Sequence, residues 1–168
     1  MGRRGLGALL YKRGDLEGAE AAYRRGDERG DAIAASNLGD LLEERGDTEG
    51  AEAAYRRGDE RGDGWAAANL GALLHRRGDL EGAEAAWRRG DERGDGGAAL
   101  NLGRLLAKRD LAGARAAFQR AIDSGHAKRA PAAALRLGLL LAKQRDPAGA
   151  RDAFRQFWAL CSKGSSSR

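Results

Sequence analysis

One block of 18 residues occurs three times in this chain at a spacing of 32 residues. The copies are GDLEGAEAAYRRGDERGD, GDTEGAEAAYRRGDERGD and GDLEGAEAAWRRGDERGD, and they begin at Gly14, Gly46 and Gly78. Near-identity at a period of this size is typical of a stacked array, in which each unit buries its apolar face against its neighbours. Such arrays usually present a binding surface, so the repeat favours an interaction protein over an enzyme.

Alanine and glycine are abundant in the chain, whereas β-branched residues are almost absent, which favours closely packed helices over sheets. Within the second unit, apolar residues recur at helical spacing on both sides of the dipeptide Gly46-Asp47. Glycine suits the left-handed residue that ends a helix, and aspartate caps the next one. Each unit is therefore predicted to be a pair of helices joined by a short turn.

The same reasoning places every helix along the chain. First helices are expected near residues 3–13, 32–45, 64–77, 96–109 and 131–144. Second helices are expected near 16–29, 48–61, 80–93, 111–124 and 147–161. The predicted domain organisation is one repeat array over 1–161, with units near 1–30, 31–62, 63–94, 95–130 and 131–161, and a disordered tail over 162–168.

Each unit also carries a Leu-Gly pair, a leucine three residues later, an alanine and an aromatic residue, in that order. In the second unit these residues are Leu38, Gly39, Leu42, Ala51 and Tyr55. The other units repeat them as Leu6, Gly7, Leu10, Ala19, Tyr23; Leu70, Gly71, Leu74, Ala83, Trp87; Leu102, Gly103, Leu106, Ala114, Phe118; and Leu137, Gly138, Leu141, Ala150, Phe154. This pattern resembles the tetratricopeptide repeat over nearly the whole chain. The resemblance implies an all-α, right-handed α-solenoid of about five helix-turn-helix repeats that binds proteins and has no catalytic activity or cofactor.

The chain departs from that family pattern inside its second helices. Gly26, Gly58 and Gly90 stand where the family has a helical alanine. Each glycine should cost roughly 1 kcal/mol of helix stability. The second helices are therefore expected to be less straight beyond Arg25, Arg57 and Arg89.

One face of each predicted first helix carries residues at positions i, i+4, i+7 and i+11. The resemblance implies that this face lines a concave groove in which peptides bind. An asparagine amide both donates and accepts hydrogen bonds, so asparagines on this face could hold an extended peptide backbone; the alternative is that they bond to the chain itself. The stripe changes from acidic to basic, which predicts a ligand running from basic to acidic along the array. The candidate groove residues are Asn37, Asp40, Glu44, Trp65, Asn69, Arg76, Asn101, Arg104, Lys108, Arg136 and Lys143.

The charge and the aromatic residues near the end of the chain indicate a second possibility. Residues 1–103 hold 16 basic and 21 acidic residues, whereas residues 104–168 hold 14 and 4. Phe157 and Trp158 make the last helix unusually apolar, although terminal repeats normally need a polar outer face. The two aromatic residues either fold over the last helix pair or form an open surface. The alternative function is therefore a structural protein that self-associates head to tail into homo-oligomers.

Two weaker alternatives come from short motifs and charge. Arg-Gly-Asp, the tripeptide that integrins recognise, occurs nine times, but turn and capping chemistry explains it more simply. The basic half could bind nucleic acid, but no aromatic residues alternate with its basic stripe.

Other classes of function have no support in the sequence. No phosphate-binding glycine motif is present, no histidine has metal-ligand spacing, and no apolar run reaches the length of a membrane span. Cys161 is expected to be a packed thiol. We therefore expect a cytoplasmic protein without metal or cofactor whose ligand is a protein or peptide.

Overall fold

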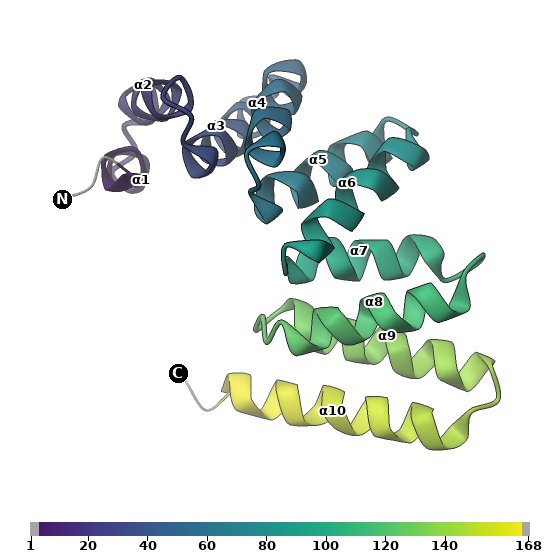
Figure 1. Cartoon of the computed structure of the whole chain (residues 1–168). Coiled ribbons are helices and arrows are strands. Elements are labelled where there is room, and N and C mark those ends of the chain that lie inside the picture. The colour runs from purple at the N-terminus through teal and green to yellow at the C-terminus, as the bar shows by residue number, and fades with distance from the viewer. Residues whose placement is uncertain (1–3, 166–168) are drawn as a thin grey trace. The chain divides into compact units, whose positions relative to one another are not determined.

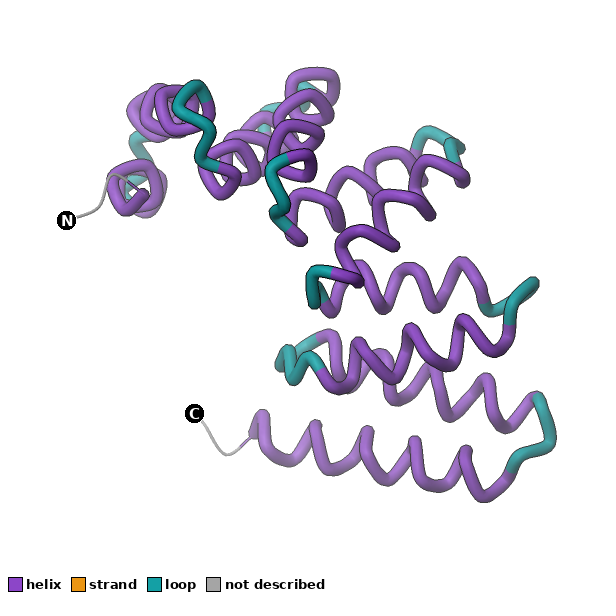
Figure 2. The backbone as a smooth tube through the Cα atoms, in the orientation of Figure 1, coloured by secondary structure: helices purple, strands orange, loops and turns teal. Residues whose placement is uncertain are grey.

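The structure is a computed structural model that describes residues 4–165, with side chains for residues 5–162. Within this part of the chain every regular element is an α-helix, and Figure 2 shows only helices joined by short loops. The all-α prediction is therefore confirmed. The chain forms two compact units, the first ending at Arg93 and the second beginning at Gly94.

The first unit contains three helix pairs (Figure 1). Each first helix packs against its own second helix, and each second helix packs against the next first helix. The elements are α1 (Arg4–Lys12), α2 (Leu16–Asp27), α3 (Ala32–Glu44), α4 (Thr48–Glu60), α5 (Gly64–Arg76) and α6 (Leu80–Glu92).

The second unit contains two further pairs, in which α8 packs against both α7 and α9. Its elements are α7 (Gly96–Leu106), α8 (Leu111–Asp123), α9 (Arg129–Lys143) and α10 (Pro147–Ser165). The helix α10 continues past the expected end at residue 161 and into the segment predicted as a disordered tail. Residues 166–168 of that tail lie outside the described residues.

The turns form as the Gly-Asp dipeptides predict. Gly46 has a φ of 80°, and the amide of Asp47 donates to the carbonyl of Leu42 at 2.9 Å, which closes α3 with a Schellman motif. The Asp47 carboxylate then accepts from the Gly50 amide at 2.9 Å and caps α4. One dipeptide therefore ends one helix and starts the next.

The core of each pair lies between a glycine on the first helix and an aromatic ring on the second. A Cβ added to Gly39 would lie only 2.5 Å from the ring of Tyr55, and the Tyr55 side chain is 1% exposed. The ring therefore needs a residue without a side chain at this position. This contact explains why the glycine of the Leu-Gly pair and the aromatic residue recur together in every helix-pair repeat.

The second helices continue past their internal glycines. The helices α2, α4 and α6 continue to Asp27, Glu60 and Glu92. A Cβ on Gly58 would lie 2.7 Å from the Cβ of Ala66 on α5. The glycine is thus required for close approach of the next repeat, and this packing offsets its low helix propensity.

Candidate peptide-binding site

Asp40 on α3 is the centre of a hydrogen-bonded cluster on the first-helix face of the first unit. It accepts from the Tyr55 hydroxyl at 2.7 Å, from Trp65 Nε1 at 3.2 Å and from Asn69 Nδ2 at 2.9 Å. These three donors come from α4 and α5, so the cluster joins two consecutive repeats. Trp65 and Asn69 are four residues apart on one helix face, which lets one carboxylate bind both.

The cluster changes the ionisation of its members. Burial raises the pKa of Asp40, while the bonds from Tyr55, Trp65 and Asn69 act in the opposite direction without cancelling it. Burial and the bond to Asp40 raise the pKa of Tyr55 far above its ordinary value, so its hydroxyl stays protonated. Tyr55 is therefore a fixed donor that holds the Asp40 carboxylate in place.

Two more carboxylates extend this acidic face. The Tyr11 hydroxyl of α1 donates to both carboxylate oxygens of Glu44, at 2.6 and 2.8 Å. Glu43 accepts from Tyr55 at 3.0 Å and forms an ion pair with Arg76. The first-helix face of α1, α3 and α5 is therefore acidic and lined by phenol groups.

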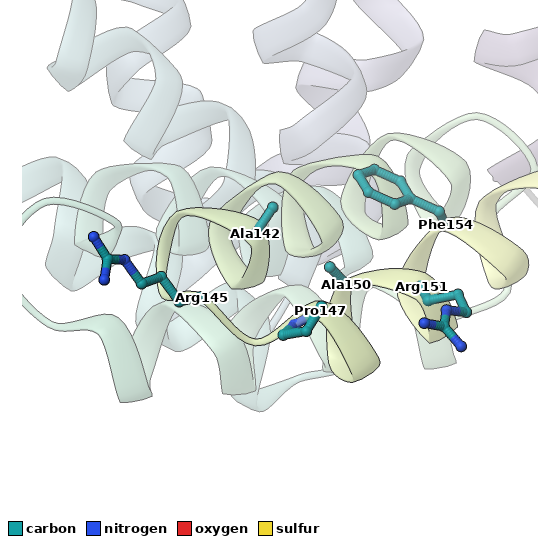
Figure 3. A pocket seen from close by; sticks show the side chains of 6 residues that line it. All are labelled: Ala142, Arg145, Pro147, Ala150, Arg151 and Phe154. Atoms are coloured by element: carbon teal, nitrogen blue, oxygen red, sulfur yellow. The ribbon is translucent and has the colours of Figure 1, made fainter.

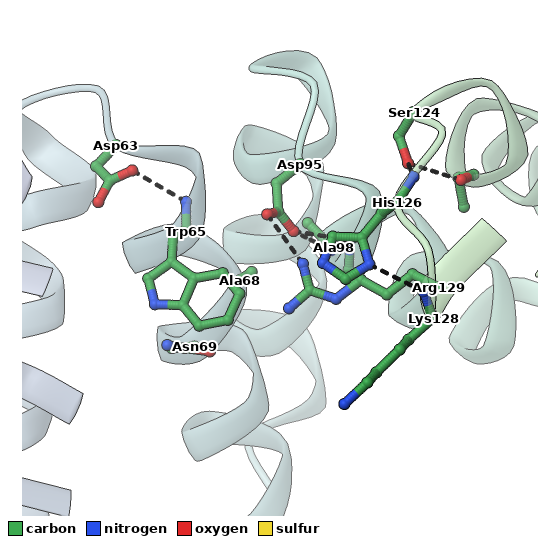
Figure 4. Close-up of polar contacts among 12 residues, drawn as sticks. Asp63, Trp65, Ala68, Asn69, Asp95, Ala98, Ser124, His126, Lys128 and Arg129 are labelled. Atoms are coloured by element: carbon green, nitrogen blue, oxygen red, sulfur yellow. Dashed lines mark hydrogen bonds and ion pairs between the residues drawn. The ribbon is translucent and has the colours of Figure 1, made fainter. Parts of the chain in front are cut away.

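Apolar and amide groups border the same face. Ile33 is 47% exposed and Trp65 is 38% exposed, although both are large hydrophobic residues. The side-chain amide of Asn37 makes no hydrogen bond with any described residue. Asn37, Ile33 and Leu6 line a cavity of about 640 Å³ between α1, α2 and α3. Figure 4 shows the amide of Trp65 capped by Asp63, which fixes the start of α5. The first unit thus offers exposed apolar, acidic and amide groups together.

The corresponding face of the second unit is basic. Asn101 on α7 accepts from Arg104 at 3.5 Å, while Arg136 and Lys143 on α9 are exposed and make no ion pair with described residues. Lys108 lies in the turn after α7, not on the predicted helix stripe. Leu135 and Leu139 of α9 are 37% and 48% exposed.

Arg129 adds a further cation to this face that the sequence pattern did not indicate. Its guanidinium lies 3.4 Å from the Asp95 carboxylate that caps α7, as Figure 4 shows. A Cβ on Gly97 would lie 2.6 Å from its Cζ, so the guanidinium occupies the position at which Trp65 and Ile33 stand in earlier repeats. The signal available in the sequence was the glycine at that stripe position.

The predicted groove residues are therefore brought together only in part. Asp40, Trp65 and Asn69 form one cluster, and Asn101 bonds to Arg104. The contributions of Tyr11, Tyr55 and Glu43 were missed. Tyr55 matched a core position, and Glu43 lies one residue off the stripe.

The end of the second unit has an open aromatic surface. Trp158 is 70% exposed, and its ring meets that of Phe157 edge-on at 5.3 Å. A cavity of about 580 Å³ lies beside the turn between α9 and α10, and Figure 3 shows Phe154 and Arg151 on its wall. Cys161 is exposed, so the prediction of a packed thiol is wrong.

The Arg-Gly-Asp tripeptides serve capping and packing. Six have a glycine with positive φ in a turn and an aspartate that caps the following helix, as at Asp15, Asp31 and Asp47. The other three lie inside α2, α4 and α6, where Asp27, Asp59 and Asp91 are buried. The local structure therefore accounts for the motif.

Residues 4–165 contain no group of three or more histidine, cysteine or acidic side chains placed to hold a metal ion. Nor is any helix in this range both long enough and apolar enough to span a bilayer.

Comparison with known families confirms the resemblance. One tetratricopeptide repeat model matches residues 4–64 and 100–162, and a second matches residues 64–89. The chain belongs to the tetratricopeptide repeat family. No curated protein matches its sequence.

Solved structures of similar fold include three that cover nearly all of this chain. The antigen c5321 of uropathogenic Escherichia coli, which has an SLR fold, is 25% identical with a TM-score of 0.76, over 97% of this chain and 37% of that one. MamA from Desulfovibrio magneticus RS-1 is 19% identical with a TM-score of 0.64, over 99% and 96%. YrrB, described as a TPR protein with an unusual peptide-binding site, is 21% identical with a TM-score of 0.62, over 95% and 85%. These likenesses agree with the α-solenoid class.

Proposed function

We propose that this protein is a non-enzymatic interaction module that binds a peptide or protein segment on the first-helix face of its repeats. The Asp40 cluster carries the proposal, because side chains from α3, α4 and α5 fix one another there and leave Trp65 partly exposed. A face held rigid before binding loses little conformational entropy when a ligand arrives. The peptide-binding site named for YrrB, a protein of similar fold, supports the same class of function.

The charge of the face selects the ligand. On the first unit Glu43 and Glu44 are directed to the same side as Asp40 and favour a basic segment. On the second unit Arg104, Arg136 and Lys143 favour an acidic one. The first unit is therefore expected to bind a basic segment and the second unit an acidic one. A ligand that binds both units would carry a basic and an acidic segment.

A labelled 12-residue peptide of alternating lysine and serine tests the acidic face of the first unit. The variant Glu43→Gln/Glu44→Gln keeps acceptors for Tyr11 and Tyr55 but removes two charges, and it should weaken binding several-fold. Each exposed ion pair contributes about 0.2–1 kcal/mol. The measurement is fluorescence anisotropy at low salt.

The matched control is Glu17→Gln/Glu28→Gln, which removes two exposed charges on or beside α2. Equal weakening by both variants would show a general charge effect and reject the site. Asn37→Ala tests the amide contact without breaking a bond inside the protein, and it should cost about 0.5–1.5 kcal/mol of binding free energy.

A second candidate function is self-association, and the exposure of Trp158 favours it. An aromatic residue that is 70% exposed on a terminal helix can bury a large apolar area against a second copy. The surface of α10 would then be the contact.

A further inference from the structure

Successive repeats of the first unit are joined by the same set of ion pairs. Glu20 of α2 pairs with Arg45 at the end of α3, and Glu52 of α4 pairs with Arg77 at the end of α5. The acid and its arginine are 25 residues apart in both cases. This contact therefore recurs at equivalent positions of consecutive repeats.

A second ion-pair set lies two helical turns further along each second helix. Arg57 Nε donates to Asp27 at 2.8 Å, and Arg61 Nη1 lies 2.5 Å from the same carboxylate. In the next repeat, Arg89 and Arg93 hold Asp59 at 2.9 and 2.5 Å. Both α2 and α4 thus present a glutamate and, seven residues later, an aspartate to three arginines of the following repeat. Positions seven apart share one helix face.

The first repeat carries the arginines of this contact, but no described helix presents acidic residues to them. Arg13, Arg25 and Arg29 stand 32 residues before Arg45, Arg57 and Arg61. All three are exposed, and none of their guanidinium groups makes a hydrogen bond or ion pair with a described residue. The edge formed by α1 and α2 is therefore a basic surface. The equivalent arginines of the second and third repeats are neutralised by the acidic residues of α2 and α4.

The apolar residues of this edge are also uncovered. Leu6 and Leu9 of α1 are 47% and 43% exposed, whereas their equivalents Leu38 and Leu41 on α3 are 1% exposed. In the second repeat this surface is covered by the preceding second helix, α2, which packs against α3. The exposed leucines and the arginines of this edge therefore both fit a helix that packs and pairs as α2 does on the second repeat.

We propose that the edge of α1 and α2 docks an acidic α-helix of a partner protein, which carries a glutamate and an aspartate seven residues apart. Arg13 pairs with the glutamate, and Arg25 and Arg29 pair with the aspartate. Leu6 and Leu9 are covered by the helix body. The assignment follows from charge complementarity and from two copies of the same contact inside the chain.

A second copy of this chain does not supply such a helix at its last repeat. The helix α10 has Arg151 and Trp158 where α4 has Glu52 and Asp59. The acid pairs of α2 and α4 already bind arginines of their own chain. Glu84 and Asp91 of α6 have the same spacing, but Asp91 is buried. A second copy of this chain is therefore not the expected occupant.

The test uses two labelled 20-residue alanine-based helical peptides, one with Glu and Asp seven residues apart and one with the same acids five apart. Five residues place the acids on different helix faces. The first peptide should bind the full chain at least about fivefold more tightly, and added salt should weaken it. Equal binding of the two peptides, or no binding of the first, overturns the proposal.

Variants of the protein locate the contact. Arg25→Gln/Arg29→Gln should weaken binding of the first peptide at least about fivefold, a change of roughly 1 kcal/mol. Arg115→Gln/Arg151→Gln removes the same charge from exposed positions of α8 and α10, outside the candidate groove, and should leave binding unchanged. Weakening by the second variant alone places the peptide elsewhere and rejects the proposal. Amide shift mapping on the wild type should show changes at Leu6, Leu9 and Arg29, which checks the site even if a variant folds poorly.

Discussion

A single missing methyl group decides how closely two repeats of the first unit can pack. At Gly58 an added Cβ would lie 2.7 Å from Ala66 Cβ, 3.0 Å from Ser36 Oγ and 3.3 Å from the Ala32 carbonyl oxygen. Gly58→Ala gains about 1 kcal/mol of helix propensity but incurs about 1–3 kcal/mol of overpacking. We expect a net loss in the free energy of unfolding, measured by urea denaturation.

Gly5→Ala is the control for this prediction, because nothing lies within 4 Å of the added Cβ in α1. It should leave stability unchanged or raise it by up to about 1 kcal/mol. If Gly58→Ala also stabilises the protein, the close approach between α4 and α5 is not what requires the glycine.

The glycines show which residue roles a sequence can predict. Gly46 was assigned to a turn correctly, because the left-handed conformation and the following cap at Asp47 are local properties. The role of Gly58 depends on Ala66, which lies in the next repeat and is not a local neighbour. Helix propensity alone therefore gives the cost of Gly58 but not the packing that requires it.

Ion pairs between second helices hold consecutive elements in register. Asp59 of α4 is buried and accepts from Arg89 and Arg93, whose side chains are 43% and 28% exposed. Asp59→Asn should lower the free energy of unfolding by about 1–2 kcal/mol, because hydrogen bonds to charged groups contribute about 1.5–3 kcal/mol and the arginines can regain water. Asp152→Asn, from an exposed pair with Arg155, should change it by less than about 0.5 kcal/mol.

The same carboxylates predict a loss of stability in acid. Burial raises the pKa of Asp27 and Asp59, but the paired arginines outweigh burial and lower the pKa of both below the ordinary value. Carboxyls with a lowered folded-state pKa stabilise the protein above the unfolded pKa of about 3.9, and this stability is lost as pH falls through the folded pKa. Urea denaturation from pH 6 to pH 2 should therefore show a decline below about pH 4.

The double variant Asp27→Asn/Asp59→Asn should flatten that decline, since it removes the groups that take up protons on unfolding. Asp40 acts with the opposite sign, because its pKa is raised by burial. A decline of unchanged size in the double variant would assign the acid sensitivity to other carboxyls.

The sequence predicts which helices carry the residues of the candidate site, but it does not predict the hydrogen bonds among them. Helical spacing placed Asp40, Trp65 and Asn69 on the first-helix faces, and the structure joins them by hydrogen bonds. Tyr55 was missed because its ring is a core residue while its hydroxyl reaches the face. A residue with both roles cannot be recognised from a pattern of apolar positions.

At the scale of the whole molecule, the two ends of the chain differ from the repeats between them. Phe157 stands at the position of Gly58, and Trp158 at the position of the buried Asp59. The ring of Phe157 would obstruct the close approach that glycine permits, and Trp158 cannot accept from an arginine pair. The ion pairs that join repeats of the first unit therefore cannot continue from α10 onto the first repeat of a second copy, and any association there must depend on apolar burial.

Sedimentation velocity over a hundredfold concentration range tests this association. If α10 mediates it, the mass should rise with concentration, and Trp158→Glu should abolish the rise, because burying a large aromatic contributes about 1.5–3 kcal/mol. Salt should then have little effect, since charge makes only a minor contribution to the contact. Arg25→Gln/Arg29→Gln is the control at the opposite end and should associate like the wild type. A constant monomer mass for the wild type rejects self-association and leaves Trp158 as an exposed residue whose replacement should not change the melting temperature.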